Sequence, residues 1–263
     1  MALLQLDREA WRRAFSRVLW NGPPLSGKTT GTLTLPRPCH LIIAPGEHGY
    51  SSVEPTDDYH IYAWDYDPQD PKSVSPRDVW KELADTVTDV LTGKHGDVKS
   101  LIIDGLHKLY DLVMRVEGWN AAMVDDKEAG RQYTKYHDKF GTFLSRVLGS
   151  AVPLVGATCY DGLEPIEPGS KQMQIFPLLP GRMAKDVMGM FPVVFHTEKL
   201  AGGKFVWTLK PQGRMQAAGM HIPTRYAAVI PDAIDVRVDA KTGAVSGGWE
   251  ELERLLATVG KVQ

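Results

Sequence analysis

The chain has 263 residues, of which 43% are apolar and 24% charged, which are the proportions of an ordinary soluble globular protein. These values exclude a fibrous protein and a disordered chain, and no apolar run approaches the roughly 20 residues that cross a bilayer. The formal net charge of -2 argues against coating nucleic acid through bulk electrostatics, although it leaves room for a local basic surface. The N-terminus lacks the apolar core of a signal peptide, so we expect a cytoplasmic protein.

The sequence divides into three predicted segments. Residues 1–14 are expected to form an amphipathic helical segment, residues 15–222 the core domain, and residues 223–263 an extension that ends in a helix over Trp249 to Val259. The chain has two cysteines, Cys39 and Cys159, each in or at the end of an apolar run. They are expected to be buried free thiols rather than a disulfide or a zinc site.

A phosphate-binding pattern follows the first predicted strand, Phe15 to Trp20. The pattern G-x-x-x-x-G-K-S/T is met at every fixed position by the run Gly22, Pro23, Pro24, Leu25, Ser26, Gly27, Lys28, Thr29, followed by Thr30. Glycines in such a loop let backbone N–H groups surround phosphate oxygens at the start of a helix. A second apolar strand, Cys39 to Ala44, follows, with Pro36 and Pro38 closing a short helix. This setting favours a nucleotide site over a coincidental glycine turn.

The polar side chains of this pattern have distinct expected roles. Lys28 supplies positive charge to the β- and γ-phosphates, and the Thr29 hydroxyl is placed to bind the Mg²⁺ that bridges them. Thr30 is expected to continue the helix. The predicted cofactors are therefore ATP and Mg²⁺.

An acid follows the second strand. Glu47 lies in a turn-rich segment, Pro45 to Tyr50, at the expected carboxyl edge of a parallel sheet. Ligands bind at that edge in open α/β sheets, so Glu47 is a candidate to orient or deprotonate an attacking water. The alternative is an ordinary acid of a surface loop.

Two later strands carry further candidates. Ser100 to Asp104 is an aliphatic run that ends in an acid, which is typical of the strand that holds Mg²⁺ in phosphate-loop ATPases. Asp104 is the candidate, and the alternative is an acid that merely ends a strand. Pro153 to Tyr160 is a fourth buried strand in which Thr158 is the candidate sensor of the γ-phosphate or the water. Cys159 takes that place if the register differs by one.

The remaining elements are predicted from periodicity and turn residues. Another strand is expected over Tyr59 to Asp65. A β-hairpin is indicated by the runs 192–199 and 204–209, which flank Ala201-Gly202-Gly203. Residues 117–131 are expected to form a loop or a frayed helix end, and residues 161–180 a long excursion at the catalytic edge. Helices are expected over 76–93, 106–116, 132–148 and 181–190.

Charge is distributed unevenly along the chain. Acids dominate from Glu47 to Asp89, whereas no acid occurs between Glu198 and Asp232. The second stretch contains the bases Lys199, Lys204, Lys210, Arg214 and Arg225. This pattern favours either an acidic and a basic face, which could meet between subunits, or simply a solvated hairpin.

In this order, the motifs resemble those of the RecA-like phosphate-loop ATPases. The resemblance is closest to the small phage ATPases of that group that act in single-strand annealing and recombination. It spans about residues 15–220. The residues that carry it are Gly22 to Thr29, Gly46-Glu47-His48, Leu101 to Asp104, Ala157-Thr158-Cys159 and the hairpin with its basic exit.

The resemblance implies a fold, site roles and partners. It implies an α/β fold with a mostly parallel central sheet, flanking helices and a C-terminal β-hairpin. By likeness, Glu47 is the catalytic glutamate, Thr158 the polar sensor, and Lys210 or Arg214 a basic residue that reaches a neighbouring subunit's site. Segments 117–131 and 161–180 correspond to DNA-facing loops, so single-stranded DNA and a homo-oligomer are implied. A phage product in the bacterial cytoplasm is implied too.

We therefore predict a Mg²⁺-dependent ATPase that handles single-stranded DNA in recombination or annealing. The alternative is a nucleotide-controlled module that loads or remodels a protein partner, such as a replicative helicase, which the acidic stretch and near-neutral charge favour. A small-molecule kinase is the third hypothesis, supported only by Arg182 and Arg214 as lid arginines.

Overall fold

A computed structural model describes residues 15–67, 70, 72, 74–118, 126–165, 171, 173–210, 219–220 and 230–259. The predicted N-terminal helical segment, residues 1–14, lies outside the described residues. So does the middle of each predicted DNA-facing loop, at 119–125 and 166–170.

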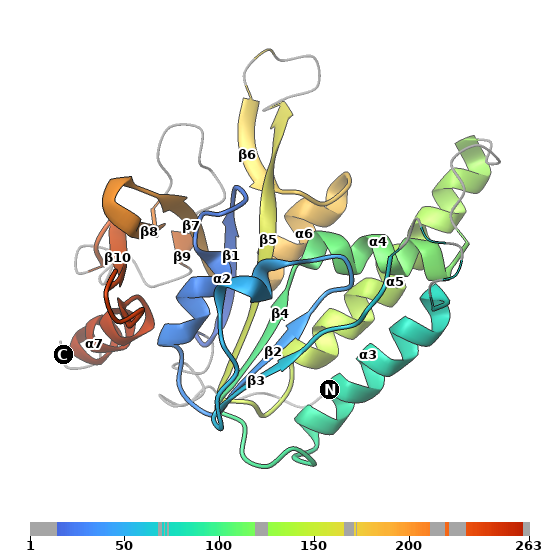
Figure 1. The fold of residues 1–263 in the computed structure, drawn as a ribbon. Coiled ribbons are helices and arrows are strands. Elements are labelled where there is room, and N and C mark those ends of the chain that lie inside the picture. The colour runs from blue at the N-terminus through green and yellow to red at the C-terminus, as the bar shows by residue number, and fades with distance from the viewer. Residues whose placement is uncertain are drawn as a thin grey trace, which may run out of the picture.

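A mostly parallel sheet forms the centre of the molecule (Figure 1). Neighbouring strands pair in parallel from β3 to β7. In spatial order they are β3 (Tyr59–Tyr62), β2 (Cys39–Ile43), β4 (Ser100–Asp104), β5 (Leu154–Pro165), β1 (Arg17–Gly22) and β7 (Val193–Lys199). The predicted α/β class is therefore confirmed. The order also places the ends of β1, β2, β4 and β5 along one edge.

The sheet continues with antiparallel strands beyond β7. β8 (Lys204–Thr208) pairs with β7, which confirms the predicted hairpin. β10 (Ala233–Val238) then pairs with β8, and β11 (Val245–Gly247) with β10, while the short β9 (Gly219–Met220) pairs with β7. Part of the predicted extension thus adds strands to the central sheet, and its proposed boundary at residue 223 stays a prediction.

Both faces of the sheet are covered by apolar packing. On one face lie α3 (Pro76–Leu91), α4 (Leu106–Val116), α5 (Asp126–Leu148) and α6 (Arg182–Met190). On the other face, Trp20, Trp207 and Trp249 pack together with the N-terminal end of α7 (Trp249–Val259). Strands buried on both faces must be aliphatic throughout, which is why their sequences read as continuous apolar runs. None of the helices in the described ranges is long and apolar enough to cross a bilayer.

Local sequence signals explain where the scaffold helices begin. Ser75 caps α3, because its hydroxyl accepts a hydrogen bond from the Asp78 N–H at 3.2 Å, and Pro76 occupies the first turn. α2 (Lys28–Gly31) is short, as predicted, and a 3₁₀ turn, η1 (Thr32–Thr34), follows it. A second 3₁₀ turn, η2 (Gly49–Ser52), follows β2.

Several predicted boundaries were wrong. Residues 161–165 are not a loop, because β5 continues and pairs with β6 (Met173–Pro177) in an antiparallel hairpin beyond the sheet edge (Figure 1). α5 begins at Asp126 rather than Gln132, so the last residues of the polar stretch 117–131 belong to this helix. β1 begins two residues later than predicted and reaches Gly22, and β3 ends at Tyr62 rather than Asp65. Cross-strand pairing, which the chain's local pattern does not encode, sets the limits of these strands.

Gly156 on β5 gives a test of the core. A Cβ at this position would lie 2.4 Å from the Trp20 ring and 2.9 Å from Ile102 Cδ1. Trp20 is itself held against Phe195 and cannot yield easily. We expect Gly156→Ala to destabilise the protein by about 1–3 kcal/mol and to lower Tm by several degrees in calorimetry.

Gly141 in α5 is the matched control, because a Cβ there meets nothing within 4 Å. Gly141→Ala should be neutral or stabilising, since alanine favours a helix interior. An unchanged Tm for Gly156→Ala would mean that the core around Trp20 is looser than described.

Candidate active site

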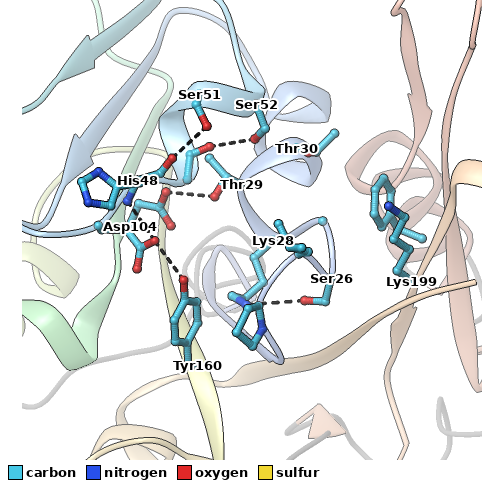
Figure 2. Close-up of a pocket in the computed structure, with 16 residues that line it drawn as sticks. Ser26, Lys28, Thr29, Thr30, His48, Ser51, Ser52, Asp104, Tyr160 and Lys199 are labelled. Carbon is cyan, nitrogen blue, oxygen red and sulfur yellow. Dashed lines mark hydrogen bonds between the residues drawn. The ribbon is translucent and has the colours of Figure 1, made fainter.

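A cleft of about 450 Å³ opens at the carboxyl edge of the sheet. The loop after β1, the turn after β2, the end of β4 and Tyr160 of β5 all line it, together with Lys199 of β7 and Phe205 of β8 (Figure 2). Its volume falls in the range of small-molecule sites. Elements that are distant in sequence therefore meet at the carboxyl ends of the strands, which is where open α/β sheets bind ligands.

The glycines of the loop after β1 are required by close contacts. Gly27 has φ of +82°, and a Cβ there would lie 2.4 Å from the Phe205 ring. At Gly22, a Cβ would lie 2.3 Å from Thr197 Oγ1. Side chains from β7 and β8 therefore pack directly on the loop. The sequence pattern predicted only the approach of phosphate at these glycines.

Lys28 is buried at the centre of this loop. Its Nζ donates to the carbonyl oxygens of Gly22 and Pro23, both at 2.7 Å, and lies 4.5 Å from the centroid of the Tyr160 ring. Burial lowers the pKa of Lys28 to about 8, and the nearby carboxylates of Asp104, Asp161 and Glu47 act in the opposite direction. The ammonium group is therefore still mostly charged at neutral pH.

Thr29 of α2 and Asp104 at the end of β4 meet in the cleft, although they are distant in sequence. Thr29 Oγ1 donates to Asp104 Oδ2 at 2.9 Å. Burial raises the pKa of Asp104 to about 6, against the opposing hydrogen bonds from Thr158 and Thr29. Gly49 lies so close that a Cβ on it would be 2.5 Å from Thr29 Oγ1. A hydroxyl and a carboxylate are the hard oxygen donors that Mg²⁺ prefers.

Thr158 is buried behind Asp104 and does not line the cleft. Its hydroxyl donates to Asp104 Oδ1 and accepts a hydrogen bond from the Gly105 N–H at 2.9 Å. The Thr158 hydroxyl therefore orients the Asp104 carboxylate and is itself held by the Gly105 N–H. Cys159, the alternative in the sequence analysis, is also buried, and burial raises the pKa of its thiol to about 12.

Glu47 is buried beside the cleft. Its Oε1 accepts hydrogen bonds from the Tyr160 hydroxyl and from the His48 N–H, both at 3.1 Å. Its Oε2 has no hydrogen-bond partner in the described ranges and lies 3.6 Å from His107 Nε2. A buried carboxylate oxygen without a partner is costly, so it is suited to accept a proton or a hydrogen bond from a ligand.

Some of the predicted site residues line the cleft and others do not. Beside Lys28, Thr29, Glu47 and Asp104, the cleft is lined by Pro24, Leu25, Ser26, Gly27 and Thr30. Gly22 and Pro23 reach the site through the carbonyl oxygens that hold Lys28. Lys210 forms an ion pair with Asp232 at 2.8 Å, and Arg214 lies outside the described residues. Arg182, the kinase-lid candidate, pairs with Asp186 on its own helix.

The sequence did not predict several residues of the site, among them Tyr160, His107, Thr197 and Phe205. Tyr160 could have been found, because it lies two residues after Thr158 and side chains at that spacing share one face of a strand. His107, Thr197 and Phe205 carry no such signal. Their places depend on which strands are neighbours, and the Ser26 to Thr197 hydroxyl contact at 2.6 Å spans 171 residues of sequence.

A glycine-bounded loop, a buried lysine and a threonine–aspartate pair at the edge of a parallel sheet define the class of P-loop NTPases. A family model described as an AAA domain matches residues 14–217, well over half of the chain, so the chain belongs to this family of nucleotide-binding ATPase domains. A search of curated proteins found no match.

Asp104 makes the stability of the protein depend on pH. Its pKa in the folded state, about 6, exceeds its ordinary value of 3.8. Its contribution to stability is therefore fully present below pH 3.8 and is lost as pH rises through about 6. We expect Asp104→Asn, measured without Mg²⁺, to raise Tm by a few degrees at pH 7 and much less at pH 4. A lower Tm at pH 7 would contradict this electrostatic account.

Proposed function

We propose that the chain binds ATP with Mg²⁺ in this cleft and hydrolyses it. The observation that carries the proposal is the contact of Thr29 with Asp104, beside Lys28 and Glu47 in the same cleft. A phosphate-binding cation, two hard oxygen ligands and a buried carboxylate are the parts that phosphoryl transfer to water requires.

The chain's own groups have separate roles in this proposal. Backbone N–H groups of the loop bind phosphate oxygens, and the Lys28 ammonium exchanges its carbonyl partners for the β- and γ-phosphates. Thr29 and Asp104 hold Mg²⁺, which neutralises phosphate charge when bound. Thr158 orients Asp104 through the bond between their side chains. Its role is therefore one of support rather than of direct γ-phosphate sensing.

Glu47 acts as the base in this proposal. It lies in the turn that follows β2, the strand adjacent to β4, so both acids line the same cleft. It orients the attacking water and takes its proton, while the loop stabilises charge on the transferring phosphoryl group.

We further propose single-stranded DNA as the target of the ATPase, in recombination or annealing by a homo-oligomer of phage type in the bacterial cytoplasm. The support is the resemblance described above, together with the β5–β6 hairpin, which extends from the same sheet edge as the cleft (Figure 1). A basic group from a neighbouring subunit, Lys210 or Arg214, would complete the site. Lys210 would first have to leave Asp232.

One observation favours the alternative, a module that remodels a protein partner. The hairpin carries Leu163, 61% exposed, and the flanking Leu178 is 49% exposed, with the half-buried acid Glu164 next to Leu163 in the chain. Exposed leucines next to an acid suit a protein surface better than a phosphate backbone.

Lys28→Ala tests nucleotide binding. We expect it to weaken ATP binding in calorimetry by at least about 10-fold, because a charge-assisted contact to phosphate is lost. Lys94→Ala is the matched control, since it removes an exposed lysine that pairs with Asp89. Equal ATP affinity of the wild type and Lys28→Ala would contradict the proposed site.

Single-stranded DNA and salt separate the two targets. If DNA is the target, an oligonucleotide should raise the ATPase rate, and the stimulation should fade steeply with salt because bound phosphates release counterions. A rate that DNA does not change at any salt concentration would contradict the DNA proposal and support the protein partner.

A further inference from the structure

Two aromatic side chains flank the Glu47 carboxylate. Tyr160 lies on β5, one residue before that strand begins to pair with β6, and His107 lies in the first turn of α4. Their rings stack with centroids 4.2 Å apart and an angle of 27° between planes. The two rings therefore support each other beside the carboxylate.

Tyr160 acts on one oxygen of Glu47. Its hydroxyl donates to Oε1 at 3.1 Å, and burial raises the pKa of Tyr160 to about 12, so the phenol stays protonated at neutral pH. The His48 N–H donates to the same oxygen. Two donors from different elements fix the direction of the carboxylate.

His107 faces the other oxygen. Its Nε2 lies 3.6 Å from Oε2, slightly beyond hydrogen-bond distance, and both ring nitrogens are buried without a hydrogen-bond partner in the described part of the chain. Burial lowers the pKa of His107 to about 4, so the ring is neutral at pH 7 and has one N–H. In the tautomer that carries the proton on Nε2, a shift of a few tenths of an ångström would let this N–H donate to Oε2.

We infer that Tyr160 and His107 are positioning residues that hold the Glu47 carboxylate at the angle from which it takes the proton of the attacking water. This inference rests on the proposed role of Glu47 as the base. Tyr160 also contacts the Lys28 ammonium, so one ring touches both the phosphate-binding lysine and the base. Loss of the phenol hydroxyl should therefore slow turnover without weakening ATP binding.

Tyr160→Phe and Glu47→Gln, alone and combined, test the inference by a double-mutant cycle. Phenylalanine keeps the ring that touches Lys28 and His107 and removes only the hydroxyl. We expect kcat of Tyr160→Phe to fall about 10-fold with the Kd for ATP within about two-fold. The double variant should be no slower than Glu47→Gln, because a residue that acts through Glu47 has no effect once the base is gone.

His107 is tested by two substitutions. His107→Phe keeps an aromatic ring and removes both nitrogens, whereas His107→Gln keeps an N–H donor near the place of Nε2. We expect kcat to fall with phenylalanine and to be largely recovered with glutamine. Tyr133→Phe is the matched control, since that hydroxyl donates to the Pro180 carbonyl at 2.6 Å, outside the cleft. It should leave kcat unchanged.

The outcomes distinguish the role of Glu47 from the roles of Tyr160 and His107. Wild-type turnover by Glu47→Gln would overturn the role of Glu47 itself. If Glu47→Gln is slow, three results would overturn only the positioning role. These are an unchanged kcat of Tyr160→Phe, additive losses of kcat in the double variant, and a loss of ATP affinity in Tyr160→Phe that parallels its loss of kcat. If Tyr160→Phe fails to fold, as a thermal melt would reveal, equal kcat of the two His107 variants decides against the inference.

Discussion

The rest of the site depends on the hydrogen bonds that the buried Asp104 carboxylate accepts. Thr29, at the start of α2, donates to one of its oxygens, and Thr158 on β5 donates to the other. These bonds join the loop after β1 to the ends of two neighbouring strands. Burial of a carboxylate with only neutral donors costs free energy, which is why its pKa rises to about 6. The packing on both sheet faces offsets this cost, and the site retains an acid suited to a divalent cation.

Contiguous patterns predicted much of the fold and the centre of the site. The phosphate loop, the strand that ends in Asp104 and the acid after β2 are local patterns, and parallel strands bring their carboxyl ends to one edge. Glu47 therefore lies in the same cleft as Lys28. The remaining features of the site depend on which strands pair with one another. The neighbour relation of β1 and β7 sets Thr197 against Gly22, and the extension of β5 beyond the sheet sets the limits of its hairpin.

Charge along the sequence proved a poor guide to surface charge. The stretch without acids after Glu198 predicted either a basic face or a solvated hairpin, and in the structure Lys204 pairs with Asp235 at 2.9 Å and Lys210 with Asp232 at 2.8 Å. Both acids lie just beyond that stretch, at or near β10, which the fold brings back against β8. Two of the expected basic groups are therefore neutralised within the chain, which bears on the choice between DNA and a protein as the target.

The most direct measurement of the central claim is phosphate release from ATP in the presence of Mg²⁺, by the wild type and by Glu47→Gln, with ATP affinity measured on the same samples. The account predicts turnover by the wild type and release at least about 100-fold slower by Glu47→Gln, with similar ATP affinity, because the base is lost and the phosphate contacts remain. Equal release by the two proteins, or none by the wild type under any condition in which ATP binds, would contradict it.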